Sequence, residues 1–94
     1  MRLIKEFLLD SKLLSPQTLY LPADTQVVNV LNTETGLMLL TITVPDEVTT
    51  QLPVLRTFKI CTSDEKIYAN TVKYVGSFNG LSGIRHVIEI IKGD

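Results

Sequence analysis

The span from Tyr74 to Ile90, YVGSFNGLSGIRHVIEI, holds the residues whose types could do chemistry. Three glycines and two serines precede His86, the single histidine of the chain. Glycine-rich loops bind phosphate where they lead into a helix, whose N-terminal amides hold the anion. The sequence after Gly83 has the composition of a strand, and no Lys-Ser or Lys-Thr pair follows it. The span therefore predicts a β-hairpin, with Asn79, Gly80 and Gly83 at positive φ and Gly76 at a bulge or a close-packed position.

His86 and Glu89 have the residue types of a general base and its orienting carboxylate, or of two metal ligands. They are three residues apart, and a strand sends residues at odd spacing to opposite faces. The pair therefore cannot act together. The more apolar face carries His86 with Ile84, Ile88 and Ile90, so we predict that it faces the core and that Arg85, Val87 and Glu89 are exposed.

Other catalytic constellations are missing from the sequence. A metal at His86 would need at least two more protein ligands, and Cys61 is the only cysteine in the chain. At the end of an apolar strand, Cys61 is expected to be a small buried hydrophobe. Ser63, Ser77 and Ser82 have neither a strained nucleophile elbow nor an adjacent oxyanion element. We therefore predict that the protein is not an enzyme and holds no metal or cofactor.

Composition sets further bounds on function. The 94 residues, 45% of them hydrophobic, predict one globular domain over residues 1–94. Nine Lys and Arg residues against ten Asp and Glu residues, without clustering, disfavour nucleic-acid binding. The single cysteine excludes an intramolecular disulfide and fits a reducing compartment. No apolar run reaches the roughly 18 to 20 residues of a membrane helix, and Lys5, Glu6 and Asp10 interrupt any targeting signal, so a soluble intracellular protein is expected.

Strand patterns dominate the chain and favour an all-β fold. Leu40, Ile42 and Val44 alternate with two threonines in the clearest half-buried strand. Residues 2–9 fit a strand or two helical turns, of which we favour the strand, and residues 45–53 fit a loop better than a short helix begun at Pro45. The strands are expected at 2–9, 17–21, 26–32, 37–44, 54–62, 66–78 with a break near Asn70, and 84–91. Six to seven short strands with at most one short helix predict a single small antiparallel β-sandwich or barrel.

Tyrosines supply the better lead to a binding surface. Tyr20, Tyr68 and Tyr74 are amphipathic side chains of the type enriched at interfaces. The segment QTLYL, bounded by Pro16 and Pro22, is expected to be an edge strand with free backbone groups. Self-association through such edges is therefore one of the hypotheses that the sequence supports.

The order of several short motifs resembles a family of small bacteriophage β-domains of unassigned function. The motifs are LPADTQVVNV, RTFKICTSDEKI, YVGSF and HVIE, and they span residues 21 to 89. Family chains carry an L-P segment, an R-x-F-x-I-x-x-T strand, a Y-x-G-T/S turn and a terminal H-V-F-E, where this chain has Ile88 in place of the phenylalanine. The resemblance implies a phage source and a β-fold rather than an activity.

Small phage proteins without catalytic motifs often act by occupying a surface. Our first hypothesis is an accessory binding module in the host cytoplasm that antagonises a host protein or defence system. The alternatives are a virion or assembly component that associates with itself through edge strands, and an oligomer that sequesters a small anionic ligand such as a nucleotide signal between subunits. The binding residues expected first are Tyr74, Arg85 and Glu89, followed by Arg56, Tyr20 and His86.

Overall fold

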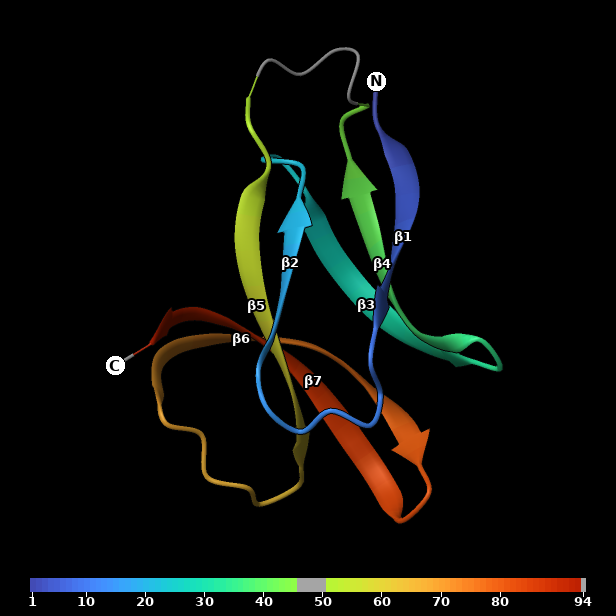
Figure 1. Cartoon of the computed structure of the whole chain (residues 1–94), viewed down its shortest axis with the longest axis vertical. Coiled ribbons are helices and arrows are strands. Elements are labelled where there is room, and N and C mark those ends of the chain that lie inside the picture. Colours follow the sequence, from blue (N-terminus) through green and yellow to red (C-terminus); the bar gives the residue numbers. More distant parts are fainter. Residues whose placement is uncertain (46–50, 94) are drawn as a thin grey trace.

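Seven β-strands form two antiparallel sheets in the computed structural model, which describes residues 1–45 and 51–93 (Figure 1). One sheet has three strands in the order β1–β4–β3, and the other has four in the order β2–β5–β7–β6. The strands are β1 (Leu3–Leu9), β2 (Gln17–Leu21), β3 (Gln26–Thr33), β4 (Gly36–Thr43), β5 (Val54–Thr62), β6 (Ala69–Gly80) and β7 (Gly83–Gly93). The described residues include no helix. The prediction of a small antiparallel β-sandwich or barrel is confirmed, and the two separate sheets correspond to the sandwich.

Local predictions also agree with the fold. Residues 2–9 were assigned to a strand, and β1 occupies Leu3–Leu9. QTLYL is β2, an edge strand that pairs with β5 alone in the described part of the chain. The strand predicted over residues 66–78 is β6, which begins only at Ala69, and the break expected near Asn70 corresponds to its irregular pairing with β7 over Ala69–Val72. The prediction for residues 45–53 falls mainly on residues 46–50, which lie outside the described residues.

The core lies between the sheets and draws on all seven strands. The four-stranded sheet contributes Phe58 and Ile60 of β5 and Val87 of β7, which are fully buried. Strand β3 of one sheet lies against β6 of the other, which closes one side of the sandwich. The other buried residues of the main cluster are Leu9, Leu21, Val27, Val30, Leu37, Leu39, Val75 and Phe78.

Strand β4 buries its threonines and turns part of its apolar side outward. Thr41 and Thr43 are buried, whereas Leu40 and Ile42 are only partly buried. The buried hydroxyls are satisfied: Thr41 donates to the Lys5 carbonyl at 2.8 Å, and the Thr43 and Thr25 hydroxyls share a hydrogen bond of 3.0 Å. Alternation alone identified the strand but not its inner face, because burying a hydroxyl is tolerated once it is hydrogen-bonded.

The predicted faces of β7 are wrong. Val87 and Glu89 point into the sandwich, where Val87 pairs with Ile60 and Glu89 with Phe58. His86 and Ile88 therefore lie on the outer face, although Ile88 is still only 4% exposed. Both faces of the strand carry large aliphatic residues, so hydrophobicity could not select between them. An ion pair between Arg56 of β5 and the buried Glu89 of β7 accounts for the inward orientation of the Glu89 side chain.

The span from Tyr74 to Ile90 forms a hairpin between β6 and β7, as predicted, with Gly80 opposite Gly83. Only Gly83 among the three residues expected at positive φ has it, at 128°. The pairing register of β6 with β7 shifts between Tyr74 and Gly76, so Gly76 lies at the predicted bulge. A Cβ at Gly76 would stand 2.6 Å from Oδ1 of Asn29, so glycine allows β3 and β6 to approach each other.

Candidate functional site

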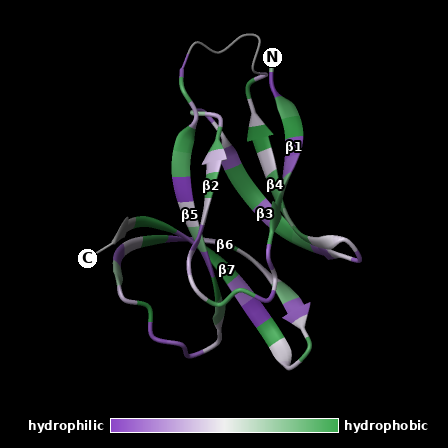
Figure 2. Ribbon diagram, in the orientation of Figure 1, coloured by the Kyte–Doolittle hydropathy of each residue, from purple (hydrophilic) through white to green (hydrophobic). Residues whose placement is uncertain are grey.

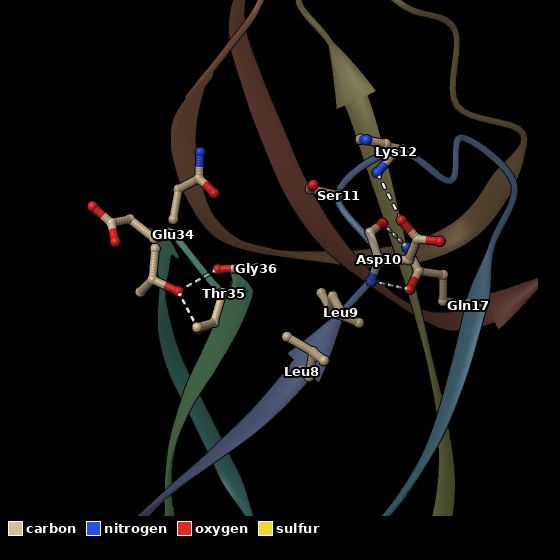
Figure 3. A pocket seen from close by; sticks show the side chains of 11 residues that line it. Leu8, Leu9, Asp10, Ser11, Lys12, Gln17, Glu34, Thr35 and Gly36 are labelled. Carbon is tan, nitrogen blue, oxygen red and sulfur yellow. Dashed lines mark hydrogen bonds between the residues drawn. The ribbon is translucent and has the colours of Figure 1, made fainter.

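A groove at one end of the sandwich is the largest of the three cavities considered, at about 750 Å³ (Figure 3). Its walls are the end of β1 with the loop that follows it, and the β3–β4 turn. Gln17 fixes the loop, since its side-chain amide donates to the Asp10 carbonyl at 2.7 Å and its oxygen accepts from the Asp10 amide at 2.9 Å. Asp10 in turn accepts from the Lys12 amide at 3.0 Å. The charged residues lining this groove are Asp10, Lys12 and Glu34.

A second cavity of about 440 Å³, which we call the hairpin pocket, adjoins the groove and shares Ser11, Lys12 and Asn32 with it. Its opposite wall is the β6–β7 hairpin, including Phe78, Leu81 and Arg85. The Asn32 side-chain amide donates to the Asn79 carbonyl at 3.3 Å and ties β3 to the hairpin. Lys12 and Arg85 are the charged residues of the lining, and both are cationic.

His86 stands between two hydroxyl groups on the outer face of the four-stranded sheet. Its Nε2 lies 2.9 Å from Oγ of Ser63, and its Nδ1 lies 2.9 Å from the hydroxyl of Tyr74. A hydroxyl beside a histidine resembles an activated nucleophile, but a phenol occupies the place where a carboxylate would stabilise the imidazolium. These side chains line neither the groove nor the hairpin pocket, nor a third cavity of about 650 Å³ that Arg56 and Glu89 help to line.

Arg56 and Glu89, both expected at a binding surface, bind each other instead. Nε of Arg56 donates to one Glu89 oxygen at 2.6 Å and Nη2 donates to the other at 2.7 Å, while Nη1 donates to the Thr25 carbonyl at 2.6 Å. The Glu89 side chain is 4% exposed and that of Arg56 is 18% exposed. Since Thr25 also bonds Thr43 of β4, this network joins the two sheets. Glu89 is not on an exposed face, contrary to the prediction.

The outer side of the three-stranded sheet is apolar and uncovered in the described part of the chain. Its register places Ile4, Leu8 and Leu31 on the same side as Met38, Leu40 and Ile42, and we call these six residues with Glu6 the β1–β4–β3 outer face. On β3 the same register sets two polar residues, Gln26 and Asn29, opposite Ile42 and Leu40 at the border of this face. Ile4 is 77% exposed, Leu8 55% and Leu31 51%. Figure 2 shows hydrophobic residues along much of β1, β3 and β4. This face was not singled out from the sequence, although LIKEFLL carries apolar residues on both of its sides.

The remaining predicted residues are dispersed. Tyr20 and Tyr74 are exposed on the outer side of the four-stranded sheet. Tyr68, on the loop before β6, is also exposed. Arg85 lines the hairpin pocket. Tyr74 and His86 are thus brought together, as are Arg56 and Glu89, but the structure does not gather the six predicted residues into one site.

Cys61 is buried, as predicted, and burial raises the pKa of its thiol. Such a thiol is a poor nucleophile at neutral pH because the thiolate is the reactive form. Among residues 1–45 and 51–93, no cluster of three or more His, Cys, Asp or Glu side chains has a geometry that could hold a metal ion.

The chain matches no family model, no curated protein and no solved structure. A search of the described residues for a helix long and apolar enough to cross a membrane found none.

Proposed function

We propose that this chain is a non-enzymatic binding module that occupies the surface of a host protein through the β1–β4–β3 outer face. The exposure of Ile4, Leu8 and Leu31 on one side of a single sheet carries the proposal. Contiguous exposed apolar side chains on a soluble domain are characteristic of protein interaction sites, because water is removed from them when a partner binds. The phage source that the resemblance implies supports a host protein as the target and antagonism as the outcome.

The charge on the face favours a partner different from the chain itself. Glu6 lies midway along β1, opposite Leu40 of β4, and takes part in no ion pair among the described residues. Glu6 is the charged residue of this face, so a symmetric contact would bury each Glu6 carboxylate without an opposite charge from the face, and a twofold axis across the strands would bring the two carboxylates together; both arrangements are destabilising. A partner surface that is apolar with one Lys or Arg opposite Glu6 would complement it. We therefore assign the occupant as a host protein with such a surface.

The His86 cluster supports a non-enzymatic function. Ser63, His86 and Tyr74 form the hydrogen bonds of a nucleophile and base, yet a neutral phenol replaces the carboxylate and the three line none of the cavities above. Catalysis needs a place that holds the reacting group against both nucleophile and oxyanion donors. We assign these side chains to the polar part of the outer sheet surface.

Four proteins test the binding proposal: the wild type, Ile4→Lys, Glu6→Lys and the control Tyr68→Lys. Tyr68 is 79% exposed and lies on the loop before β6, away from the three-stranded sheet. The partner is isolated from bacterial host lysate with the wild type, purified, and titrated calorimetrically against all four. We expect 1:1 binding that Ile4→Lys and Glu6→Lys each weaken by at least about tenfold and that Tyr68→Lys leaves unchanged. Equal affinities for the four proteins would refute the assignment of this face.

Self-association through an edge strand is the second candidate, and one observation favours it. Among residues 1–45 and 51–93, strand β2 pairs only with β5, so within this part of the chain its other edge presents unpaired backbone groups beside the exposed Tyr20. Light scattering measures the mass in solution. A monomer at high concentration would exclude this candidate, whereas a ring that Thr18→Pro dissociates would support it over the host-protein proposal.

A further inference from the structure

We propose that the hairpin pocket binds a small organic phosphate, with Arg85 and Lys12 holding the phosphate group. The pocket has a volume of about 440 Å³, within the range of about 300 to 1,000 Å³ typical of small-molecule sites. It lies at the end of the sandwich and is separate from the β1–β4–β3 outer face, so the inference does not depend on the proposed function.

The charge of the pocket selects an anion. Among the residues that the structure describes, its lining includes Lys12 and Arg85 and no carboxylate. The ion pairs among the described residues are Arg56 with Glu89 and Lys59 with Glu65, so neither pocket cation is neutralised within this part of the chain. The recorded hydrogen bond of the Arg85 guanidinium runs from Nη2 to Oγ of Ser82 at 2.9 Å, which orients the group and leaves further N–H donors. Guanidinium donors match phosphate oxygens in pairs, which makes phosphate the fitting anion.

The Arg85 side chain crosses the hairpin directly above Gly80. A Cβ at residue 80 would stand 2.9 Å from Cγ of Arg85 and 3.2 Å from its Nε. The φ of Gly80 is not positive, so backbone conformation does not account for the glycine. The space above Gly80 does, because a Cβ there would meet the Arg85 stem and, at 3.2 Å, the backbone oxygen of Gly83.

The remaining lining fits the organic part of the ligand. Phe78 and Leu81 from the hairpin and Leu14 from the β1–β2 loop supply apolar surface, and Asn32 and Asn79 supply polar groups beside it. Apolar walls with a few convergent polar groups are the usual composition of a small-molecule pocket. Lys12 comes from the loop that Gln17 fixes, so both cations stand on restrained segments.

Titration with AMP, followed by amide chemical shifts of the labelled protein, tests the site. We expect saturable shifts confined to residues 10–15 and 78–86, with dissociation constants about tenfold to a hundredfold higher for Arg85→Ala and Lys12→Ala than for the wild type. The matched control Lys66→Ala, which removes an exposed cation outside the pocket, should bind AMP as the wild type does. Amide spectra of each variant without ligand establish that it is folded.

Adenosine and inorganic phosphate separate the two halves of the proposal. Adenosine should produce no saturable shifts, and phosphate should bind more weakly than AMP to the same residues. AMP binding that Arg85→Ala leaves unchanged, or the absence of saturable shifts, would overturn the site. Adenosine binding as tightly as AMP would overturn the role of the anion, and phosphate binding as tightly as AMP would overturn the assignment to an organic ligand.

Discussion

Removing either member of the Arg56–Glu89 pair should destabilise the protein, and the two removals should differ in size. Removing one partner of a buried ion pair costs about 3 to 5 kcal/mol because the other charge is left unpaired. The Arg56 side chain is 18% exposed and keeps its bond to the Thr25 carbonyl, so the cost of Glu89→Ala should lie near about 3 kcal/mol. Arg56→Ala would leave a carboxylate that is 4% exposed, and its cost should lie near about 5 kcal/mol.

Urea unfolding followed by far-ultraviolet circular dichroism measures these differences, since the chain has no tryptophan. Glu89→Gln should retain part of the hydrogen bonding, so its loss of stability should be smaller than that of Glu89→Ala. The glutamine variant therefore gives a measurable value even where the alanine variant does not fold. Arg56→Met combined with Glu89→Leu removes both charges and should recover most of the loss. A loss below about 0.5 kcal/mol for Glu89→Ala, the size expected at an exposed site, would refute the buried-pair account.

Three further predictions concern packing and titration. Gly76→Ala should destabilise the protein by about 1 to 3 kcal/mol in the same urea assay, because the new Cβ meets Asn29 at 2.6 Å; a neutral effect would contradict the close approach of β3 and β6. Cys61 should resist alkylation at pH 7 and react fully in urea, since burial raises the pKa of its thiol and thiolate forms only at higher pH; rapid reaction of the folded protein would show that the thiol is accessible. The pKa of the Glu65 carboxyl, measured by NMR, should lie below its usual range because Lys59 donates to it at 2.8 Å, and Lys59→Ala should return the pKa toward normal. A depressed pKa in the folded state adds stability at neutral pH, and this stability is lost as the pH falls through that pKa. An identical titration in the Lys59→Ala variant would contradict the assigned cause.

Strand positions could be predicted from the sequence because turn residues punctuate the chain. Pro16, Pro22 and the Asn-Gly and Ser-Gly steps of the last hairpin mark boundaries that the structure keeps. The positive φ expected at Asn79 and Gly80 is absent, since the turn itself falls on Leu81 and Ser82 and the strand geometry extends through Gly80. Turn composition therefore located the hairpin without fixing its register.

Strand faces could not be predicted where both sides of a strand are apolar. In β7 the isoleucines outnumber the inward residues Val87 and Glu89, and in β4 the buried side carries two threonines. The sequence did contain one usable signal: Arg56 shares the apolar face of Phe58 and Ile60 and needs an opposite charge inside the sandwich. Glu89 meets that need, but the register that places it there is a long-range property.

The hydrogen bonds of His86 were equally beyond local pattern. Ser63 and Tyr74 are 23 and 12 residues from it, and three strands must pair before they meet. Likewise Lys12 and Arg85 line one pocket although they are 73 positions apart in the sequence, because the β1–β2 loop packs beside the final hairpin. Apolar surplus on β1 was visible in LIKEFLL, and it is the feature on which the proposed binding function depends.

Photocrosslinking in bacterial host cells tests that function most directly. A photoreactive phenylalanine analogue replaces Leu31 on the β1–β4–β3 outer face or, as the control, Tyr68 on the distant loop. We expect one heterologous protein crosslinked at position 31, absent at position 68 and lost when Ile4→Lys is added. Equal crosslinking from both positions, or crosslinking at position 31 to a second copy of the chain, would contradict the proposal that this face binds a host protein.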